Sequence, residues 1–450
     1  MDLFLIRTIE EFLDYDTRVT MRQVCHTWHT DLAPIMIGGS SLQDLLTLPS
    51  DQMAKVALIH GFHKLLTFAV KQGFNDWNQG LLWACQGNHQ TIIQRLSLDD
   101  RGIYDWNMGL YGACLGGHDV LIQKCLTLGA TNVNRGLLWA CQGGHLSSMY
   151  ELIKCGANDW NLGLYGACRG GHLSLCKELI KYGATNLSRG LFWACYGGHD
   201  ALVQMLIDLG VTDWNTGLSG ACQGGHVSLI QKLIQYGAND WNSGLYDACL
   251  SGHLSSVQIM IDHGATNWNG GLSGACRGGN LILCQKMINH GADDWNDGLA
   301  MACLAGHLIL CQEMIKYGAP AIDWNYGFYL ACQENHIAVV QLLIDHGGSL
   351  IDCDRGLYAA CWGGNHLELI QKLIQYGAND WNMGLNGACQ GGHVQAAQMM
   401  IDHGALSIDW NQGLSTACQV GHDTIVHMMI EHGATYCDNC HHTSDTHQIK

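Results

Sequence analysis

Apolar and polar positions recur with a fixed period between residues 76 and 422. The recurring string has the form D-W-N-x-G-L-x-x-A-C-x-G-G-H, and seven consecutive intervals between its cysteines, from Cys114 to Cys303, are 27 residues each. A degenerate copy at residues 57–63 precedes the first full one, which gives fourteen units over about residues 52–435. A short period repeated this often is typical of a solenoid, in which each unit stacks only on its neighbours.

Each unit predicts two short helices. In one representative unit, Leu245, Ala248 and Cys249 fall on one helical face, and a second helix follows that ends at Gly264 as a C-terminal glycine. Asn242, the third residue of D-W-N, is expected to cap the first helix, because equivalent positions hold only Asn, Asp or Ser. Neither helix is long enough to be stable alone. The predicted fold is therefore an all-α solenoid of about fourteen stacked helix pairs, with a small helical module before it.

Composition and charge narrow the function classes. The chain has 57 glycines, 3 prolines and 48% hydrophobic residues, which favours regular structure ended at fixed points by glycine. A formal net charge of −17 disfavours nucleic acids and anionic membranes as partners. No window approaches the roughly 18 apolar residues of a membrane span, and the first residues do not resemble a signal peptide. We therefore expect reduced cysteines and a cytoplasmic location, with the nucleus as a second option.

The second half of the unit resembles the ankyrin repeat family. The run G-H-x-x-x-V-x-x-L-I-x-x-G-A, seen near 198–211, is similar to the ankyrin pattern, as is the Ala-Cys pair at a position where ankyrin repeats carry two small residues. The family's unit has about 33 residues. The shortfall of about six residues here falls where ankyrin repeats project a β-hairpin finger, so we expect finger-less units. The resemblance also implies that the repeated histidine forms a hydrogen bond across the inter-repeat turn.

The repeated cysteines are expected to be small buried residues. Equivalent positions in stacked helices lie about 8–10 Å apart, which is too far for a disulfide. A Cys-x-x-x-His pair supplies two ligands where zinc needs four, and thirteen copies argue against a single nucleophile. The repeated Trp of D-W-N is expected to fill the space of the missing finger and to pack against the next turn. An aromatic cage for a cation is the alternative.

Candidate binding residues lie where the pattern varies, directly before and after the Ala-Cys pair. In ankyrin-like stacks these positions face the concave groove, and Trp, Tyr and Arg are the usual hot-spot residues of interfaces. The alternation of Trp and Gly from Trp83 to Trp193 predicts a ridged apolar groove for a partner segment. Packing of these side chains on their neighbours is the alternative. The candidate groove residues are Trp83, Trp139, Arg169, Trp193, Tyr196, Asp247, Arg277, Met301 and Trp362.

Residues 1–32 do not share the period and resemble an F-box. An isoleucine- and leucine-containing helix is followed by a short turn and by the string R-Q-V-C-H-T-W at 22–28. The resemblance implies docking on a Skp-type adaptor of cullin ubiquitin ligases; a helical cap on the first repeat is the alternative. A linker is predicted over 33–51. The adaptor surface implied by the resemblance comprises Ile9, Phe12, Leu13, Val24 and Trp28.

The C-terminal tail, residues 436–450, contains a Cys-x-x-Cys string. Cys437, Cys440 and His441 are residue types that zinc prefers, but one such string without a second pair is a weak signal. We expect a flexible tail with no metal, and no cofactor elsewhere.

These observations predict an interaction protein rather than an enzyme. The preferred function is a substrate-recruiting adaptor for a cullin/Skp-type ubiquitin ligase, with protein partners and no small-molecule substrate. The combination of motifs resembles proteins of large DNA viruses of eukaryotes, which implies a host–virus interaction. A scaffold with no ubiquitin link is the first alternative. A metal- or cysteine-dependent enzyme is a further one, disfavoured because no single nucleophile, base and orienting group stand out.

Overall fold

The computed structural model describes residues 48–97, 105–318, 323–405 and 410–434. The F-box-like residues Ile9, Phe12, Leu13, Val24 and Trp28 lie outside the described residues, as do Cys437, Cys440 and His441 of the tail. Most of the predicted linker lies outside them too. The described residues are therefore those of the repeats.

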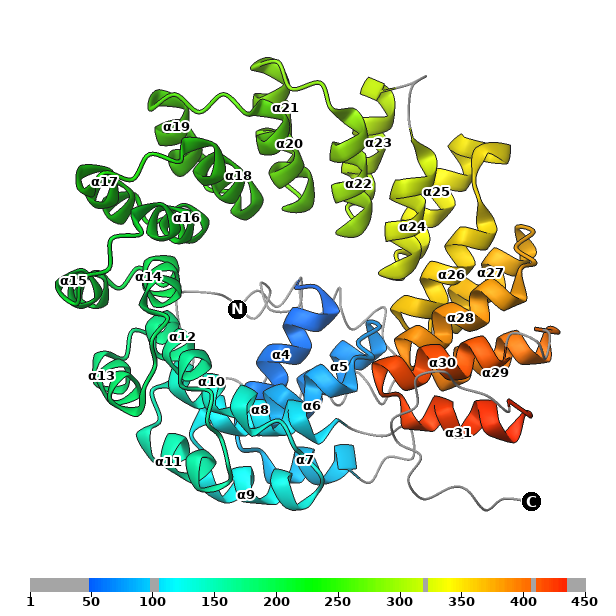
Figure 1. Cartoon of the computed structure of the whole chain (residues 1–450), viewed down its shortest axis with the longest axis horizontal. Coiled ribbons are helices and arrows are strands. Elements are labelled where there is room, and N and C mark those ends of the chain that lie inside the picture. Colours follow the sequence, from blue (N-terminus) through cyan, green and yellow to red (C-terminus); the bar gives the residue numbers. More distant parts are fainter. Residues whose placement is uncertain (1–47, 98–104, 319–322, 406–409, 435–450) are drawn as a thin grey trace, which may run out of the picture. The chain divides into compact units, whose positions relative to one another are not determined.

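The described chain divides into two compact units, the first of which ends at Thr212. Within residues 48–212 it contains six helix pairs, in which an even-numbered first helix is followed by an odd-numbered second helix (Figure 1). The helices are α4 (Ser50–His60), α5 (His63–Lys71), α6 (Trp77–Gln86), α7 (Gln90–Ser97), α8 (Trp106–Gly116), α9 (Asp119–Thr127), α10 (Val133–Gly143), α11 (Leu146–Lys154), α12 (Trp160–Gly170), α13 (Leu173–Tyr182), α14 (Leu187–Tyr196) and α15 (Asp200–Asp208).

The second unit begins at Asp213 and contains eight helix pairs, with one short 3₁₀ helix at Gly348–Leu350. Its α-helices are α16 (Trp214–Gly224), α17 (Val227–Tyr236), α18 (Trp241–Ser251), α19 (Leu254–Asp262), α20 (Trp268–Arg277), α21 (Leu281–Asn289), α22 (Trp295–Leu304), α23 (Leu308–Gly318), α24 (Trp324–Gln333), α25 (Ile337–Gly347), α26 (Cys353–Gly363), α27 (Leu367–Gln375), α28 (Trp381–Gly391), α29 (Val394–Asp402), α30 (Trp410–Val420) and α31 (Asp423–Glu431).

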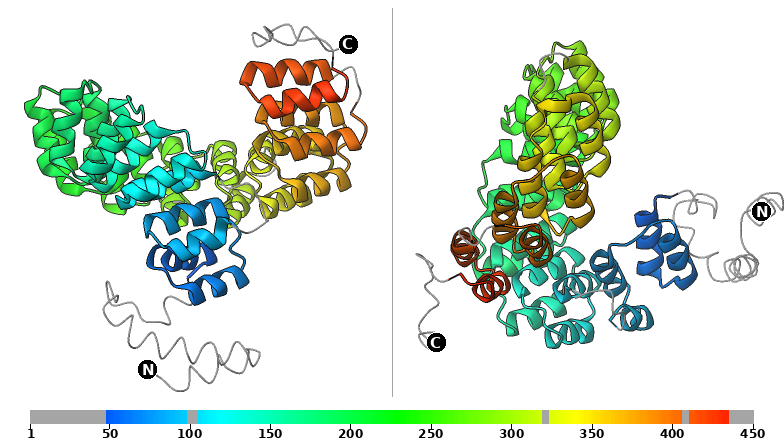
Figure 2. Two further views of the ribbon diagram at one scale, coloured as in Figure 1. Left: turned by 90° about the horizontal axis from the view of Figure 1, so that it is seen from below. Right: turned by 90° about the vertical axis from the view of Figure 1, so that its right-hand side faces the viewer.

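Within each unit the even-numbered helices lie side by side in one layer and the odd-numbered helices in a second layer, a pairing that Figure 2 shows from two further directions. The fourteen pairs and the absence of strands from the described residues confirm the predicted all-α solenoid of helix pairs. Four residues connect α13 to α14, the tight linkage expected where ankyrin repeats project a finger. The turn begins at Gly183, whose φ of 110° favours glycine.

The residue that caps each first helix is not the one predicted. Helix α12 starts at Trp160, and the carboxylate of Asp159 caps it by accepting a hydrogen bond from the Leu162 amide at 2.9 Å. Asp or Asn caps the other first helices whose caps are described, except α4, where Pro49 precedes the helix and no side chain caps it. The expected cap, Asn161 in this unit, lies two residues further on, inside the helix. The prediction was wrong because both positions carry side chains of capping type.

The asparagine inside the helix joins neighbouring pairs instead. Oδ1 of Asn161 accepts hydrogen bonds from the amides of Thr185 and Asn186, both at 2.9 Å, in the connection to the next pair. This contact satisfies two backbone donors directly before α14. Two-amide contacts of the same kind are made by Asn107, Asn134, Asn215, Asn242, Asn269 and Asp354.

The repeated histidine forms a hydrogen bond across the inter-repeat turn to the preceding helix pair, as predicted. Nε2 of His172 donates to the carbonyl oxygen of Gln142 at 3.0 Å, across one repeat. Where Asn280 replaces the histidine, its side chain caps α21 by accepting from the Leu283 amide at 3.0 Å. The same contact to a preceding repeat is made by His89, His118, His145, His199, His307, His336, His366 and His422.

The tryptophan of D-W-N packs within its own helix pair. The ring of Trp160 stacks on Tyr182 at the end of α13, with ring centres 5.1 Å apart, and Trp268 stacks on His290 at 4.6 Å. Tyr or His holds the equivalent place for Trp214, Trp241, Trp295 and Trp381. The tryptophan therefore has a packing role, as expected. The ring that it stacks on, however, belongs to the same helix pair and not to the next turn.

Candidate interaction surface

The variable positions that flank the Ala-Cys pair lie on the even-numbered helices. We call this set of positions the first-helix face. Of its nine predicted residues, only Arg277 is exposed, and the other eight are half-buried. Partial burial leaves each ring or charged group some area for a partner while its stem packs on neighbouring helices. No comparison or contact tests binding itself, so the nine residues remain a prediction.

In the first unit, two tryptophans of this face pack against other aromatic rings. Trp83 of α6 lies against Phe74, with ring centres 6.1 Å apart. Trp139 of α10 stacks on Tyr111 of α8 at 6.4 Å and an interplanar angle of 23°. The structure thus brings neighbouring helices together through rings, and packing and surface display coexist in the same side chains.

The densest cluster of the first unit lies on α12 and α14. The guanidinium of Arg169 lies 5.3 Å from the ring centre of Trp193 and 5.2 Å from that of Tyr196. A second guanidinium, that of Arg189, lies 4.6 Å from the ring centre of Phe192 and 5.7 Å from that of Trp193. Stacking of this kind holds both cations in place. Of these residues, the sequence analysis had not selected Arg189 and Phe192.

In the second unit the predicted residues are more dispersed. Asp247 of α18 accepts a hydrogen bond of 2.5 Å from the Ser219 hydroxyl, and burial raises the pKa of its carboxyl above the usual range. Arg277 of α20 donates to the Tyr246 hydroxyl at 3.4 Å. Trp362 of α26 lies 6.4 Å from the ring of Tyr329. Among the described contacts, no ring joins Met301 of α22 to these groups.

The glycines of the first-helix face have a packing role. A Cβ added to Gly166 would collide with the carbonyl oxygen of Leu138 on α10, and one added to Gly274 would lie 2.6 Å from the carbonyl oxygen of Tyr246 on α18. Even-numbered helices thus approach their neighbours closely at every second junction, and glycine holds the variable position where they do. This close approach explains the alternation of Trp and Gly. Packing on neighbouring helices was the alternative that the sequence analysis left open, and the groove itself stays a prediction.

The sequence analysis also missed a row of aromatic residues one position before the variable site. Tyr111 and Phe192 belong to it and are each 8% exposed, and Tyr165, Tyr246, Tyr329 and Tyr358 continue it. Four of these side chains, Tyr111, Phe192, Tyr246 and Tyr329, receive the arginine and tryptophan contacts described above. Aromatic residues recur at one phase of the repeat, and this recurrence was the signal available in the sequence.

The repeated cysteines are buried thiols, as predicted, with one exception. Cys141 and Cys168 are fully buried, and burial raises the pKa of the Cys141 thiol to about 12. A second cysteine, Cys176 of α13, places its Sγ 3.6 Å from that of Cys168, and both thiols are free. The exception is Cys418, which is half-buried and disulfide-bonded, so the expectation of reduced thiols was wrong there.

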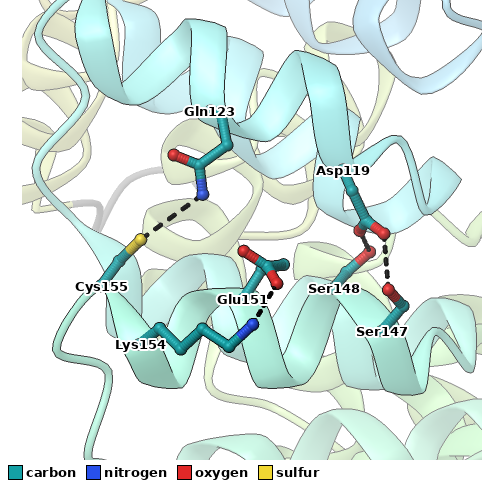
Figure 3. Close-up of polar contacts among 7 residues, drawn as sticks. All are labelled: Asp119, Gln123, Ser147, Ser148, Glu151, Lys154 and Cys155. Atoms are coloured by element: carbon teal, nitrogen blue, oxygen red, sulfur yellow. Dashed lines mark hydrogen bonds and ion pairs between the residues drawn. The ribbon is translucent and has the colours of Figure 1, made fainter.

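The odd-numbered helices contact one another through polar groups (Figure 3). The carboxylate of Asp119 on α9 accepts hydrogen bonds of 2.6 Å from the hydroxyls of Ser147 and Ser148 on α11. Burial opposes ionisation of Asp119, but these hydrogen bonds outweigh it and hold its pKa below the usual range. Further along, the amide of Gln123, in the middle of α9, lies 3.7 Å from the thiol of Cys155, which directly follows α11. These contacts join repeats rather than forming a reactive site.

Metal and membrane sites were also considered. Within the described part of the chain, no group of three or more His, Cys, Asp or Glu side chains is placed to hold a metal ion. None of the described helices has the length and apolar content needed to cross a lipid bilayer.

Residues 191–270 match the family model of ankyrin repeats over three copies. Ankyrin repeats are therefore present in this segment. Solved structures similar to the chain include the ankyrin repeat domain of human ASB11 (22% identity, 35% of this chain and 83% of that one, TM-score 0.26) and the pentatricopeptide repeat protein PPR10 from maize (13% identity, 91% of this chain and 71% of that one, TM-score 0.26). TM-scores of this size do not define the fold, which is established by the helix pairs themselves. A comparison with curated proteins finds no match.

Ankyrin repeats indicate a scaffold for protein–protein interaction. Repeats of this kind are typically binding modules without catalytic activity. The ankyrin match covers Trp193 and Tyr196 of the first unit and Asp247 of the second, so part of the first-helix face lies within it.

Proposed function

We propose that this protein recruits a target protein to a cullin/Skp-type ubiquitin ligase. The first-helix face would hold the target, and residues 1–32, by their resemblance to an F-box, would hold the ligase adaptor. The observation that carries the proposal is the row of half-buried Trp, Tyr and Arg side chains on neighbouring repeats, because such residues supply most of the binding energy of protein interfaces. Holding two proteins on one chain raises the effective concentration of the target near the transferring enzyme.

The adaptor half of the proposal is tested by purification of the tagged full-length chain from eukaryotic cells. We expect a Skp-type adaptor to copurify with the wild type and to be lost with Val24→Asp, which places a charge in the implied apolar surface. Gln23→Asp is the matched control, because it adds the same charge outside that surface. If no adaptor copurifies with any variant, the ubiquitin link fails and the scaffold alternative remains.

The target half is tested by proximity labelling with the same chain. Trp139→Ala is expected to weaken target binding by at least about 2 kcal/mol if its ring is an anchor, which is about thirtyfold in affinity. Leu173→Ala is the control, because Leu173 is an apolar side chain, 37% exposed, on the odd-numbered helix α13. Unchanged labelling after substitution of Trp83, Trp139 and Trp193 would refute binding on this face.

We place this activity in the cytoplasm, with the nucleus as the alternative, since adaptor and target must meet the chain in one compartment. A fluorescent fusion of the full-length chain tests the location. If the protein is viral, the compartment is that of the host cell.

A further inference from the structure

The even-numbered helices of the first unit carry a charge pattern unlike the rest of the protein. From α6 to α14 they contain Arg135, Arg169 and Arg189 and no Asp or Glu, although the whole chain has a formal net charge of −17. The aspartates directly before these helices are engaged as caps, as Asp159 is with the Leu162 amide. The equivalent helices of the second unit include acidic residues, among them Asp247 and Asp297.

Aromatic rings hold all three guanidinium groups in place. Arg169 and Arg189 lie 5.3 Å and 5.7 Å from the centre of the same Trp193 ring, so their guanidinium carbons are at most 11.0 Å apart. Arg135 lies 5.9 Å from the ring centre of Tyr111, which in turn stacks on Trp139. Because stacking restricts the side chains before any partner arrives, less conformational entropy is lost on binding.

No described residue occupies the hydrogen-bonding edges of these groups. Among the described residues, no side-chain hydrogen bond or ion pair engages the guanidinium of Arg135, Arg169 or Arg189. A contact with the face of a ring uses no hydrogen-bond acceptor, so the N–H donors of these guanidinium groups remain available to carboxylates. Arg135 and Arg189 are exposed and Arg169 is half-buried, so these donors are open to a partner.

We propose that this face of the first unit binds an extended, acidic peptide segment of a partner protein. The inference rests on the proposed target-binding function and names the chemistry of the target. The three arginines lie on α10, α12 and α14, and packed helices are spaced about 8–10 Å apart. An extended chain rises about 3.3 Å per residue, so acidic residues three positions apart are about 10 Å apart, which fits the separation of at most 11.0 Å between the guanidinium carbons of Arg169 and Arg189. Apolar residues between them meet the half-buried rings of Trp139 and Trp193.

Other anions fit this arrangement less well. A single phosphoryl group needs donors that converge on one point, whereas these arginines come from three helices. Nucleic acid carries a charge at every residue, and the net charge of −17 repels such a polyanion over a long range. A peptide with spaced carboxylates matches the local charges and adds contacts to the rings.

The test uses the full-length chain and a fluorescein-labelled synthetic peptide with Glu at every third position and Leu or Tyr between. Binding is measured by fluorescence anisotropy, beside the same peptide with Gln for Glu and beside a single-stranded RNA oligonucleotide. We expect the Glu peptide to bind at least about tenfold more tightly than the Gln peptide, and to weaken as salt rises. Arg169→Gln and Arg189→Gln should each lower the affinity about tenfold. Lys177→Gln, which removes an exposed cation from α13, should leave it unchanged.

Equal binding of the Glu and Gln peptides to the wild-type chain would overturn the inference even if an arginine variant failed to fold. An equal loss with Lys177→Gln, or tighter binding of the RNA, would overturn it too. If cellular target labelling depends on Trp139 but not on Arg169 or Arg189, the acidic-peptide inference fails while the proposed function stands. Circular dichroism of each variant checks that the helices are intact.

Discussion

Substitution of one glycine tests whether close helix packing produces the alternation of Trp and Gly. In Gly166→Ala the new Cβ collides with the carbonyl oxygen of Leu138 and lies 3.0 Å from its carbonyl carbon and 3.2 Å from the Gln142 amide nitrogen. Every one of these atoms is backbone, so no rotamer change relieves the contact and α10 and α12 must move apart. The matched control is Gly190→Ala on α14, whose Cβ meets only side-chain atoms of Cys168 and Leu164, at 3.5 Å and beyond.

Two opposing effects set the expected magnitude. Alanine favours a helix over glycine by about 1 kcal/mol at either position. Overpacking in a close-packed contact costs about 1–3 kcal/mol, and a collision with backbone belongs at the upper end. Gly166→Ala is therefore expected to lower the free energy of unfolding by about 2 kcal/mol, whereas Gly190→Ala raises it by about 0.5–1 kcal/mol.

Urea unfolding followed by circular dichroism measures both variants, with amide hydrogen exchange to locate the change. Stability in a solenoid is a sum of local terms, so faster exchange should be concentrated in α10 and α12 for Gly166→Ala. Equal stability of the two variants would refute the argument that the glycine is required by close approach. So would faster exchange that is confined to α14.

Three further predictions concern other contacts. Asn161→Ala should lower the free energy of unfolding by about 1–2 kcal/mol, because two backbone amides lose their acceptor. Asn161→Asp keeps an acceptor oxygen and should restore most of that free energy. Thermal unfolding, with hydrogen exchange of the two amides, measures both variants. Burial raises the pKa of the Asp247 carboxyl in the folded protein above its value of about 4 in the unfolded chain. Its contribution to the free energy of unfolding is therefore present below about pH 4 and is lost as pH rises through the pKa of the folded protein. Asp247→Asn should therefore raise stability in urea at pH 7 but not at pH 3, and an equal effect at both would contradict it. Iodoacetamide should label the exposed Cys155 in the native chain and spare Cys141 until it unfolds, as mass spectrometry detects.

The periodic contacts were predictable where one residue type serves one physical purpose. Cys168 sits at a fixed phase of an apolar face, which predicts burial, and His172 recurs at a turn where one hydrogen bond suffices. Asn161 was misassigned because Asp159, two residues before it, is also a capping type, and residue type alone does not distinguish the two positions. The choice depends on where the neighbouring pair places its amides, which is a property of the stack.

The candidate surface was less predictable for the same reason. Variation at one phase of the repeat marked Trp139 and Gly166 as equivalent positions, but only the approach of α10 and α12 explains why the second is a glycine. The aromatic row that includes Phe192 was visible as a recurrent residue type, yet its contacts with Arg189 depend on side-chain directions that a period does not specify. The division at Thr212 has no counterpart in the repeat pattern.

The contacts of the first unit imply that the surface repeats over two helix pairs rather than one. Gly112 and Gly166 admit close approach of α6 to α8 and of α10 to α12, while Trp139 and Trp193 make ring or cation contacts where α8 meets α10 and α12 meets α14. A partner bound on this face would therefore meet a large ring at every second even-numbered helix, at intervals of about 16–20 Å. For an extended segment this spacing corresponds to about five or six residues between apolar anchors, twice the spacing inferred for its acidic residues. In the second unit the alternation lapses after Gly220, because Asp247 and then Met301 occupy positions that a tryptophan would hold, so a segment with these spacings should select the first unit over the second.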